Sequence, residues 1–226
     1  MTQQVESIEL RQDALRVVIV DDHDLFRTGL RNLLEEQGIL VVGEAAGGGD
    51  AVRSVRELAP DVVVMDLNMP GMTGVEATRQ ITGIAPLTRV LVLTISDQDS
   101  DVLDAILAGA CGYLLKDSSI QELMAGIRAA SIGESLISPN IASKVLQRVR
   151  STSSVPAIAA TIRAELSDRE IEVLKLIANG KDNAMIAGEL HISPKTVKNH
   201  ISNILMKLQI DNRIQAAVYA VKSGIV

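Results

Sequence analysis

The stretch DVVVMDLNMPGMTG, residues 61–74, decides the fold expected for the N-terminal part of this sequence. Four consecutive apolar residues precede Asp66, and the turn-forming residues Pro70, Gly71 and Gly74 follow it. A short apolar run bounded by turn residues is typical of a strand buried on both faces, as the strands of parallel sheets are. We therefore expect a parallel strand at residues 62–65, with Asp66 at its carboxyl end.

Similar apolar runs alternate with amphipathic stretches from Arg16 to about Ile132. The runs are VVIV at 17–20, ILVV at 39–42, VLVL at 90–93 and YLL at 113–115, and helices are expected to begin near Leu25, Asp50, Thr73, Asp99 and Ser118. Five β-α units in this order predict a doubly wound α/β domain with a five-stranded parallel sheet over residues 16–132. Ser118 and Gln121 have the spacing of a capping box. The glycines at 47–49 predict a flexible turn, because no Lys-Ser/Thr follows them as in a phosphate loop.

The pattern changes after Gly133. A helix-compatible stretch at 141–149 precedes RSTSSVPAIAA, residues 150–160, so we expect a linker that contains a helix at 133–164. Residues 1–15 are expected to form an N-terminal extension, and 165–226 a small all-α domain. Its first helix should begin near Asp168, behind a capping box of Ser167 and Glu170, and end at Asn179-Gly180. Further helices are expected at 183–190, 194–208 and 213–222.

Charge is distributed unevenly between the two parts. Residues 1–150 carry 13 Lys and Arg against 21 Asp and Glu, a net charge of -8, whereas residues 151–226 carry 9 against 7, a net charge of +2. Affinity for a polyanion such as DNA is therefore expected in the C-terminal part. No signal peptide or membrane span is evident, and Cys111 is the single cysteine, so a cytoplasmic protein without a membrane partner is expected.

Reactive side chains follow the predicted strands. Asp21 and Asp22 follow the first strand, Asp66 the third, Thr94 ends the fourth and Lys116 follows the fifth. Because the carboxyl ends of parallel strands meet at one edge of the sheet, these groups should share a crevice. Three clustered carboxylates repel one another unless a hard cation such as Mg²⁺ lies among them. Lys116 and Thr94 suit a phosphoryl group transferred to a carboxylate nucleophile, for which Asp66 is our candidate.

The motifs VDDHDLFRTGL, DVVVMDLNMPGMTG, VLVLT and GYLLKD resemble the receiver domain of two-component response regulators, which has a flavodoxin-like fold. The resemblance implies that a sensor histidine kinase phosphorylates Asp66, and that Asp21, Asp22, Asp66 and the backbone carbonyl of Asn68 hold Mg²⁺. It further implies a switch in which Thr94 moves toward the phosphoryl group and Tyr113 turns inward. Core packing is the alternative role for Tyr113. His23 is expected to be a solvated loop residue, because Mg²⁺ prefers oxygen ligands.

In the helix expected at 194–208, apolar residues recur at helical spacing, and the opposite face carries Lys195, Lys198, Asn199, Ser202 and Asn203. No acidic residue occurs from Ile192 to Ile210, which favours DNA over a merely solvated face. The segment at 166–208 resembles the helix-turn-helix DNA-binding domain of the LuxR type, found in the NarL/FixJ subfamily of response regulators. That resemblance implies DNA contacts from Lys195, Thr196, Lys198, Asn199, Asn203 and Lys207. Ala184-Met185 departs from the Lys-Glu common in the family, which puts a contact from the preceding helix in doubt.

The last predicted helix carries an apolar stripe that could pack on its own domain or on a second copy, and the resemblance implies the dimer. The stripe consists of Ile214, Ala217, Val218 and Val221. The function predicted is a DNA-binding response regulator, not an enzyme, in which phosphorylation of Asp66 promotes homodimeric binding to double-stranded promoter DNA. RNA polymerase is a further candidate partner.

Two alternatives stay open at this point. One is a helix-turn-helix regulator that acts independently of phosphorylation and uses the receiver for dimerisation. The other is a phosphohydrolase with an aspartyl nucleophile, of the haloacid dehalogenase kind. Such enzymes place a second Asp two residues after the nucleophile, where this sequence has Asn68, so this alternative is the weaker one.

Overall fold

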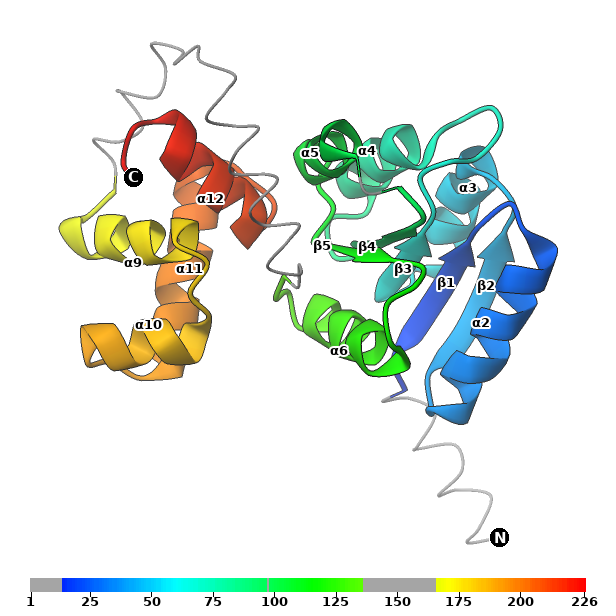
Figure 1. Ribbon diagram of the computed structural model, residues 1–226, viewed down its shortest axis with the longest axis horizontal. Coiled ribbons are helices and arrows are strands. Elements are labelled where there is room, and N and C mark those ends of the chain that lie inside the picture. The colour runs from blue at the N-terminus through cyan, green and yellow to red at the C-terminus, as the bar shows by residue number, and fades with distance from the viewer. Residues whose placement is uncertain (1–13, 97, 136–165) are drawn as a thin grey trace, which may run out of the picture. The chain divides into compact units, whose positions relative to one another are not determined.

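The computed structural model describes residues 14–96, 98–135 and 166–226 (Figure 1). The predictions for the extension before residue 14, for the helix at 141–149 and for most of the linker lie outside these residues. The chain forms two compact units. Strand β5 is hydrogen-bonded into the sheet of the first unit.

The first unit contains a five-stranded sheet in the order β2-β1-β3-β4-β5. Strand β1 pairs in parallel with β2 and β3, and β3 pairs in parallel with β4. The strands are β1 (Arg16–Val20), β2 (Leu40–Ala45), β3 (Val62–Met65), β4 (Arg89–Thr94) and β5 (Gly112–Leu115). The chain goes outward from β1 to β2 and then returns past β1 to β3, so that the order of the strands reverses at β1, where the loops after β1 and β3 diverge. The predicted doubly wound α/β fold is confirmed.

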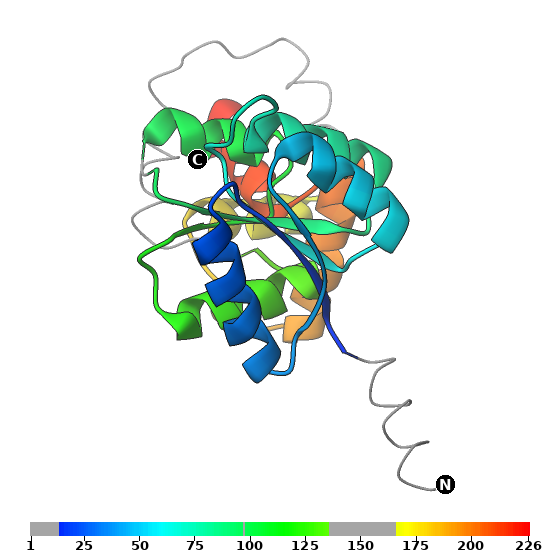
Figure 2. The same ribbon diagram turned by 90° about the vertical axis from the view of Figure 1, so that its right-hand side faces the viewer.

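Helices cover both faces of this sheet (Figures 1 and 2). Helices α2 and α6 lie on one face, and α3 and α4 on the other, where the buried side chains of β1, β3, α3 and α4 form one apolar core. The helices are α2 (Asp24–Glu36), α3 (Gly48–Leu58), α4 (Gly74–Ile84), α5 (Asp99–Leu107) and α6 (Ile120–Ser131). The side chains of β3 are all buried, as expected for a strand covered on both sides.

Two local predictions are wrong. The last helix of this unit is capped by Ser119, whose Oγ accepts from the backbone N–H of Glu122, and not by Ser118 with Gln121. The backbone N–H of Ser118 instead donates to the carbonyl of Leu115, which keeps Ser118 in the preceding turn. The glycines at 47–49 are not a flexible turn, because Gly48 and Gly49 begin α3. A Cβ on Gly48 would lie 2.7 Å from the carbonyl oxygen of Met72, so the close approach of two segments requires glycine there.

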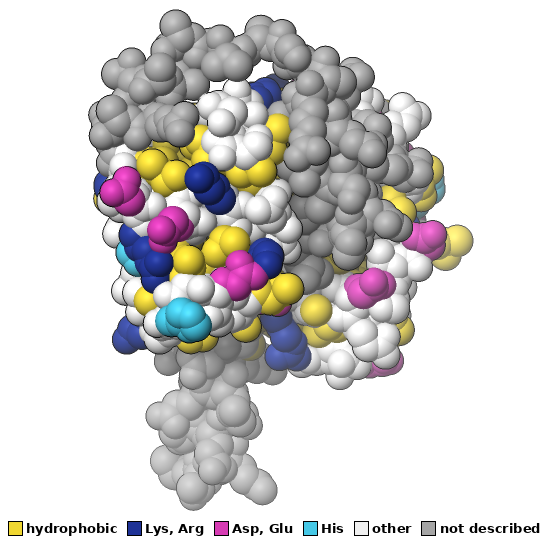
Figure 3. Space-filling model, turned by 60° about the vertical axis from the view of Figure 1, so that its left-hand side comes forward, with side chains coloured by type: hydrophobic (Ala, Val, Ile, Leu, Met, Phe, Trp, Pro, Cys, Tyr) yellow, Lys and Arg dark blue, Asp and Glu magenta, His cyan; other side chains and the backbone are white. Residues whose placement is uncertain are grey.

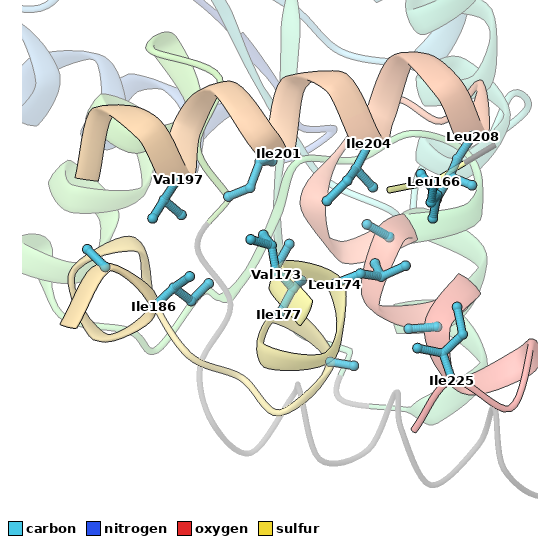
Figure 4. Close-up of a cluster of buried hydrophobic side chains, with 14 residues drawn as sticks. Leu166, Val173, Leu174, Ile177, Ile186, Val197, Ile201, Ile204, Leu208 and Ile225 are labelled. Atoms are coloured by element: carbon cyan, nitrogen blue, oxygen red, sulfur yellow. The ribbon is translucent and has the colours of Figure 1, made fainter. Parts of the chain in front are cut away.

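Within residues 166–226, the second unit has the helices α9 (Asp168–Ala178), α10 (Asn183–Leu190), α11 (Pro194–Leu208) and α12 (Arg213–Lys222). The capping box of Ser167 and Glu170 is confirmed, and α9 ends at Asn179, before Gly180 with its positive φ. Apolar side chains of all four helices share one core (Figure 4). Val197, Ile201, Ile204 and Leu208 of α11 point into that core, which leaves the opposite face of α11 for other contacts.

Candidate functional site

The sheet places Asp21, Asp66 and Lys116 at the carboxyl ends of β1, β3 and β5. Backbone hydrogen bonds continue the strand pairing to these residues. The N–H of Asp66 donates to the carbonyl of Val20 at 2.8 Å, and the N–H of Lys116 donates to the carbonyl of Thr94 at 2.9 Å. The positions of the functional side chains are therefore fixed by the sheet itself, not by a mobile loop.

Lys116 joins the two buried carboxylates. Its Nζ lies 2.6 Å from Asp21 Oδ2 and 2.7 Å from Asp66 Oδ2, and both carboxylate side chains are only 3% exposed. Burial lowers the pKa of Lys116, but the hydrogen bonds and charges of Asp21 and Asp66 outweigh burial, so that the pKa is raised. Lys116 therefore remains an ammonium at neutral pH and neutralises part of the acidic cluster.

The second oxygens of these carboxylates accept backbone hydrogen bonds. Asp66 Oδ1 accepts from the N–H of Leu67 at 2.7 Å and of Asn68 at 3.4 Å, and Asp21 Oδ1 accepts from the N–H of His23 at 2.9 Å. These bonds orient both carboxylates. Asp66 is thus held in a fixed position at the carboxyl end of β3.

Ligand atoms of Asp21, Asp22, His23 and Asp66 all lie within 4.8 Å of one another. Asp22 Oδ1 is buried and accepts no hydrogen bond among the described residues. The Nδ1 of His23 lies 2.8 Å from it. An orphaned carboxylate oxygen beside two other carboxylates fits a hard cation such as Mg²⁺. His23 is mostly exposed, as expected for a solvated residue.

Thr94 and Tyr113 are both completely buried. The Oγ1 of Thr94 accepts from the N–H of Ser96 at 3.4 Å. These positions agree with a hydroxyl at the end of β4 and a tyrosine within β5, but they do not test the predicted movement of either side chain. Asn68 is exposed and follows Asp66 by two residues, as a carbonyl ligand at this edge would.

The backbone of Gly74 packs directly against the backbone of Asp66. A Cβ at this position would lie 2.0 Å from the carbonyl oxygen of Asp66, and the N–H of Gly74 donates to the carbonyl of Leu67 at 3.0 Å. Only a residue without a side chain allows α4 to begin this close to the loop after β3. The sequence indicated Gly74 as a turn residue and missed this packing role.

Phe26 is a further residue at the site that the sequence did not reveal. Phe26 lies on the first turn of α2, and the centroid of its ring lies 4.5 Å from Lys116 Nζ. Phe26 is the single phenylalanine of the chain, which is the one signal that could have drawn attention to it.

In the helical unit, α11 has the features expected of a DNA-reading helix. Ser193 caps it by accepting from the N–H of Thr196 at 3.1 Å, and Pro194 occupies its first position. The exposed face carries Lys195, Lys198, Asn199, Ser202 and Asn203. The Oγ1 of Thr196 lies 2.8 Å from Ser193 Oγ, which holds it at the start of the helix.

Lys207 differs from the other predicted DNA contacts. Its Nζ lies 2.7 Å from Glu170 Oε2, and the Glu170 side chain is only 4% exposed. The same Oε2 accepts from the N–H and the hydroxyl of Ser167. Lys207 thus connects α11 to the capping box of α9. Figure 3 shows, on one face of the molecule, Lys and Arg side chains beside Asp and Glu side chains.

The predicted stripe on α12 is largely covered. Ile214 and Val218 are buried, while Ala217 and Val221 are partly buried and pack against the core of the helical unit. Packing on its own unit therefore accounts for Ala217 and Val221 without a second copy. Among the described residues, no helix is long and apolar enough to cross a membrane.

Two family models match this chain. Residues 17–128 match the response regulator receiver domain, and residues 164–220 match the bacterial regulatory proteins of the luxR family. The transcriptional regulatory protein LiaR of Bacillus subtilis is 46% identical over 94% of this chain and 99% of its own length. The response regulator VraR of Staphylococcus aureus is 40% identical over the same shares.

Solved structures agree with these matches. The response regulator ChrA of a heme-sensing two-component system is 37% identical, with a TM-score of 0.52 over 94% of this chain and 99% of that one. A structure of two RcsB dimers bound to two parallel DNAs is 25% identical, with a TM-score of 0.54 over 93% of this chain and 99% of that one.

Proposed function

This chain belongs to the two-component response regulators that join a receiver domain to a LuxR-type DNA-binding domain, and from that premise we propose that Asp66 is its phosphoacceptor. The observation that carries the proposal is the buried Asp66 carboxylate, 2.7 Å from Lys116 Nζ and beside the orphaned oxygen of Asp22. A sensor histidine kinase would be the phosphodonor.

In the proposed step, a carboxylate oxygen of Asp66 attacks the phosphorus atom, and the bond from phosphorus to the donor's imidazole nitrogen breaks. The product is an acyl phosphate on Asp66, and the electron pair leaves with the imidazole. Lys116 supplies a fixed positive charge for the phosphoryl oxygens, and the Thr94 hydroxyl supplies a hydrogen-bond donor. Asp21, Asp22, Asp66 and the carbonyl of Asn68 would hold Mg²⁺, which when bound offsets negative charge on the phosphoryl group.

The acyl phosphate carries close to two negative charges where the carboxylate carried one, and it brings new acceptor oxygens, so nearby donors must rearrange around it. We propose that Thr94 and Tyr113 form the element that responds. The response would expose the largely covered stripe of α12 for a homodimer through Ile214, Ala217, Val218 and Val221. Two copies related by a two-fold axis would bind two half-sites about one turn of DNA apart.

For the DNA contacts we propose the exposed face of α11. Lys195 and Lys198 would bind phosphates, while Thr196, Asn199 and Asn203 would contact phosphates or base edges. The ion pair with Glu170 favours a different role for Lys207, because its ammonium is already bound within the helical unit.

The first experiment uses Asp66→Asn, with Asp117→Asn as the control because Asp117 is an exposed acidic residue next to Lys116. Each full-length variant is incubated with a phosphodonor and Mg²⁺ and run on a phosphate-retaining gel. The wild type and the control should show a retarded band, and Asp66→Asn should show none. A retarded band in Asp66→Asn would refute the site. If phosphorylated and unphosphorylated wild type bound promoter DNA equally well, the phosphorylation-independent alternative would be favoured.

A further inference from the structure

The first turn of α2 places an aromatic ring against the ammonium of Lys116. The centroid of the Phe26 ring lies 4.5 Å from Nζ, within the range of a cation–π contact. The chain contains one phenylalanine, two tyrosines and no tryptophan, so an aromatic ring at this site is not the result of an aromatic-rich composition.

The ring is the third group that contacts the Lys116 ammonium, after the carboxylates of Asp21 and Asp66. Asp21 Oδ2 and Asp66 Oδ2 bind Nζ at 2.6 and 2.7 Å, and the Lys116 side chain is only 11% exposed. The ring therefore occupies a direction from which water would otherwise solvate the charge. A cation–π contact is stronger at such a desolvated site than on an open surface.

The Phe26 side chain is only partly buried, and its neighbour on the same turn of α2, Leu25, is 91% exposed.

We propose that Phe26 is a positioning residue for phosphoryl transfer to Asp66, and that its ring holds the Lys116 ammonium where the phosphoryl oxygens will arrive. The inference rests on the proposed function. A lysine side chain has many rotamers, and fixing one of them before the reaction removes an entropic cost from the transfer step. Phe26 would touch neither the phosphoryl group nor Mg²⁺, and would act through Lys116.

The test compares Phe26→Leu, which keeps apolar bulk without a π face, with Phe26→Tyr, which keeps the face. Leu25→Ala is the matched control on the same turn. Phosphorylation of each full-length variant by acetyl phosphate is timed at saturating Mg²⁺. We expect the rate of Phe26→Leu to fall by a factor of roughly 2 to 30, the span that cation–π energies imply. Phe26→Tyr and Leu25→Ala should remain close to the wild type.

A second readout needs neither metal nor phosphodonor. In the metal-free wild type, the ring should shift the NMR signals of the Lys116 side-chain methylene protons upfield, and Phe26→Leu should remove that shift. Because the chain has one phenylalanine, biosynthetic 4-fluorophenylalanine replaces position 26 alone. Fluorine withdraws charge from the ring face at nearly constant size, so the phosphorylation rate should lie between those of the wild type and Phe26→Leu.

The outcomes are distinguishable. Equal rates for Phe26→Leu and the wild type would overturn the role of Phe26 and leave the phosphoacceptor assignment intact. Equal losses in Phe26→Leu and Phe26→Tyr would mean that shape matters and the π face does not, which also overturns it. If the wild type took up no phosphoryl group, the proposed function would fail first and this inference with it.

Discussion

Replacing Lys195 by glutamine should weaken the salt dependence of DNA binding, whereas replacing Lys207 by glutamine should leave that dependence unchanged. Each cation that neutralises a DNA phosphate releases bound counterions, so the slope of log K against log salt reports how many such cations there are. Lys195 is exposed at the start of α11, but Lys207 Nζ is bound to the buried carboxylate of Glu170 at 2.7 Å. The two lysines lie on one helix and differ in this ion pair.

The expected change in the slope follows from the number of DNA phosphates that lose their neutralising cation. In a dimer that binds two half-sites, Lys195→Gln removes one cation from each half-site, and each cation contributes about 0.9 to the slope, so the slope should become about 1.8 less steep. If Lys195 and Lys198 are the phosphate-binding cations of each α11, the wild-type slope should be about -3.6 from these four side chains. Lys207→Gln should reduce affinity only as far as it disturbs the fold of the unit.

The assay is fluorescence anisotropy of a labelled promoter duplex with the phosphorylated full-length protein, titrated at several salt concentrations below the unfolding temperature of every variant. Lys175→Gln serves as the control, because it removes one exposed positive charge from α9. Our interpretation of α11 would be refuted if Lys207→Gln flattened the slope as much as Lys195→Gln does. An unchanged slope in Lys195→Gln would refute the phosphate contact itself.

Two further predictions concern stability and the support of the phosphoacceptor. Burial raises the pKa of Glu170, but hydrogen bonds from Lys207 and Ser167 outweigh it and the pKa is lowered from 4.5. A carboxyl with a folded pKa below its unfolded pKa stabilises the fold above the unfolded value and loses that stabilisation as pH falls through the folded value. Thermal unfolding of the isolated helical unit should therefore depend less on pH, below about 4.5, in Glu170→Gln than in the wild type. Gly74→Ala, whose Cβ would meet the carbonyl oxygen of Asp66 at 2.0 Å, should lose about 1 to 3 kcal/mol of stability by denaturant unfolding, and phosphorylation should slow. Unchanged stability in Gly74→Ala would show that α4 moves aside freely.

The sheet and its crevice were predictable because each depends on local, repetitive signals. Residues 62–65 are apolar without interruption, and the structure buries all four. A group that directly follows such a strand must lie at its carboxyl end, whatever the rest of the chain does. Asp66 and Lys116 could therefore be brought together, although they are 50 residues apart.

Which of two adjacent serines caps a helix was not predictable in the same way. Ser118 and Ser119 each precede, by three residues, a side chain that can accept a hydrogen bond. The structure uses Ser119 because Glu122 accepts from both its N–H and its hydroxyl, at 2.9 and 3.0 Å. A pattern of residue types does not contain that difference, since it depends on where the turn after β5 ends.

A contact between helices distant in the sequence explains why the ion pair of Lys207 was not predicted. Helical periodicity places Lys207 outside the apolar stripe, and a cation there looks available to DNA. The capping-box rule engages Glu170 with Ser167 but predicts no third donor to the same oxygen, because that donor is 37 residues away. The net charge of +2 in residues 151–226 therefore does not count the cations without an ion pair, since it includes Lys207, which is bound to a buried carboxylate.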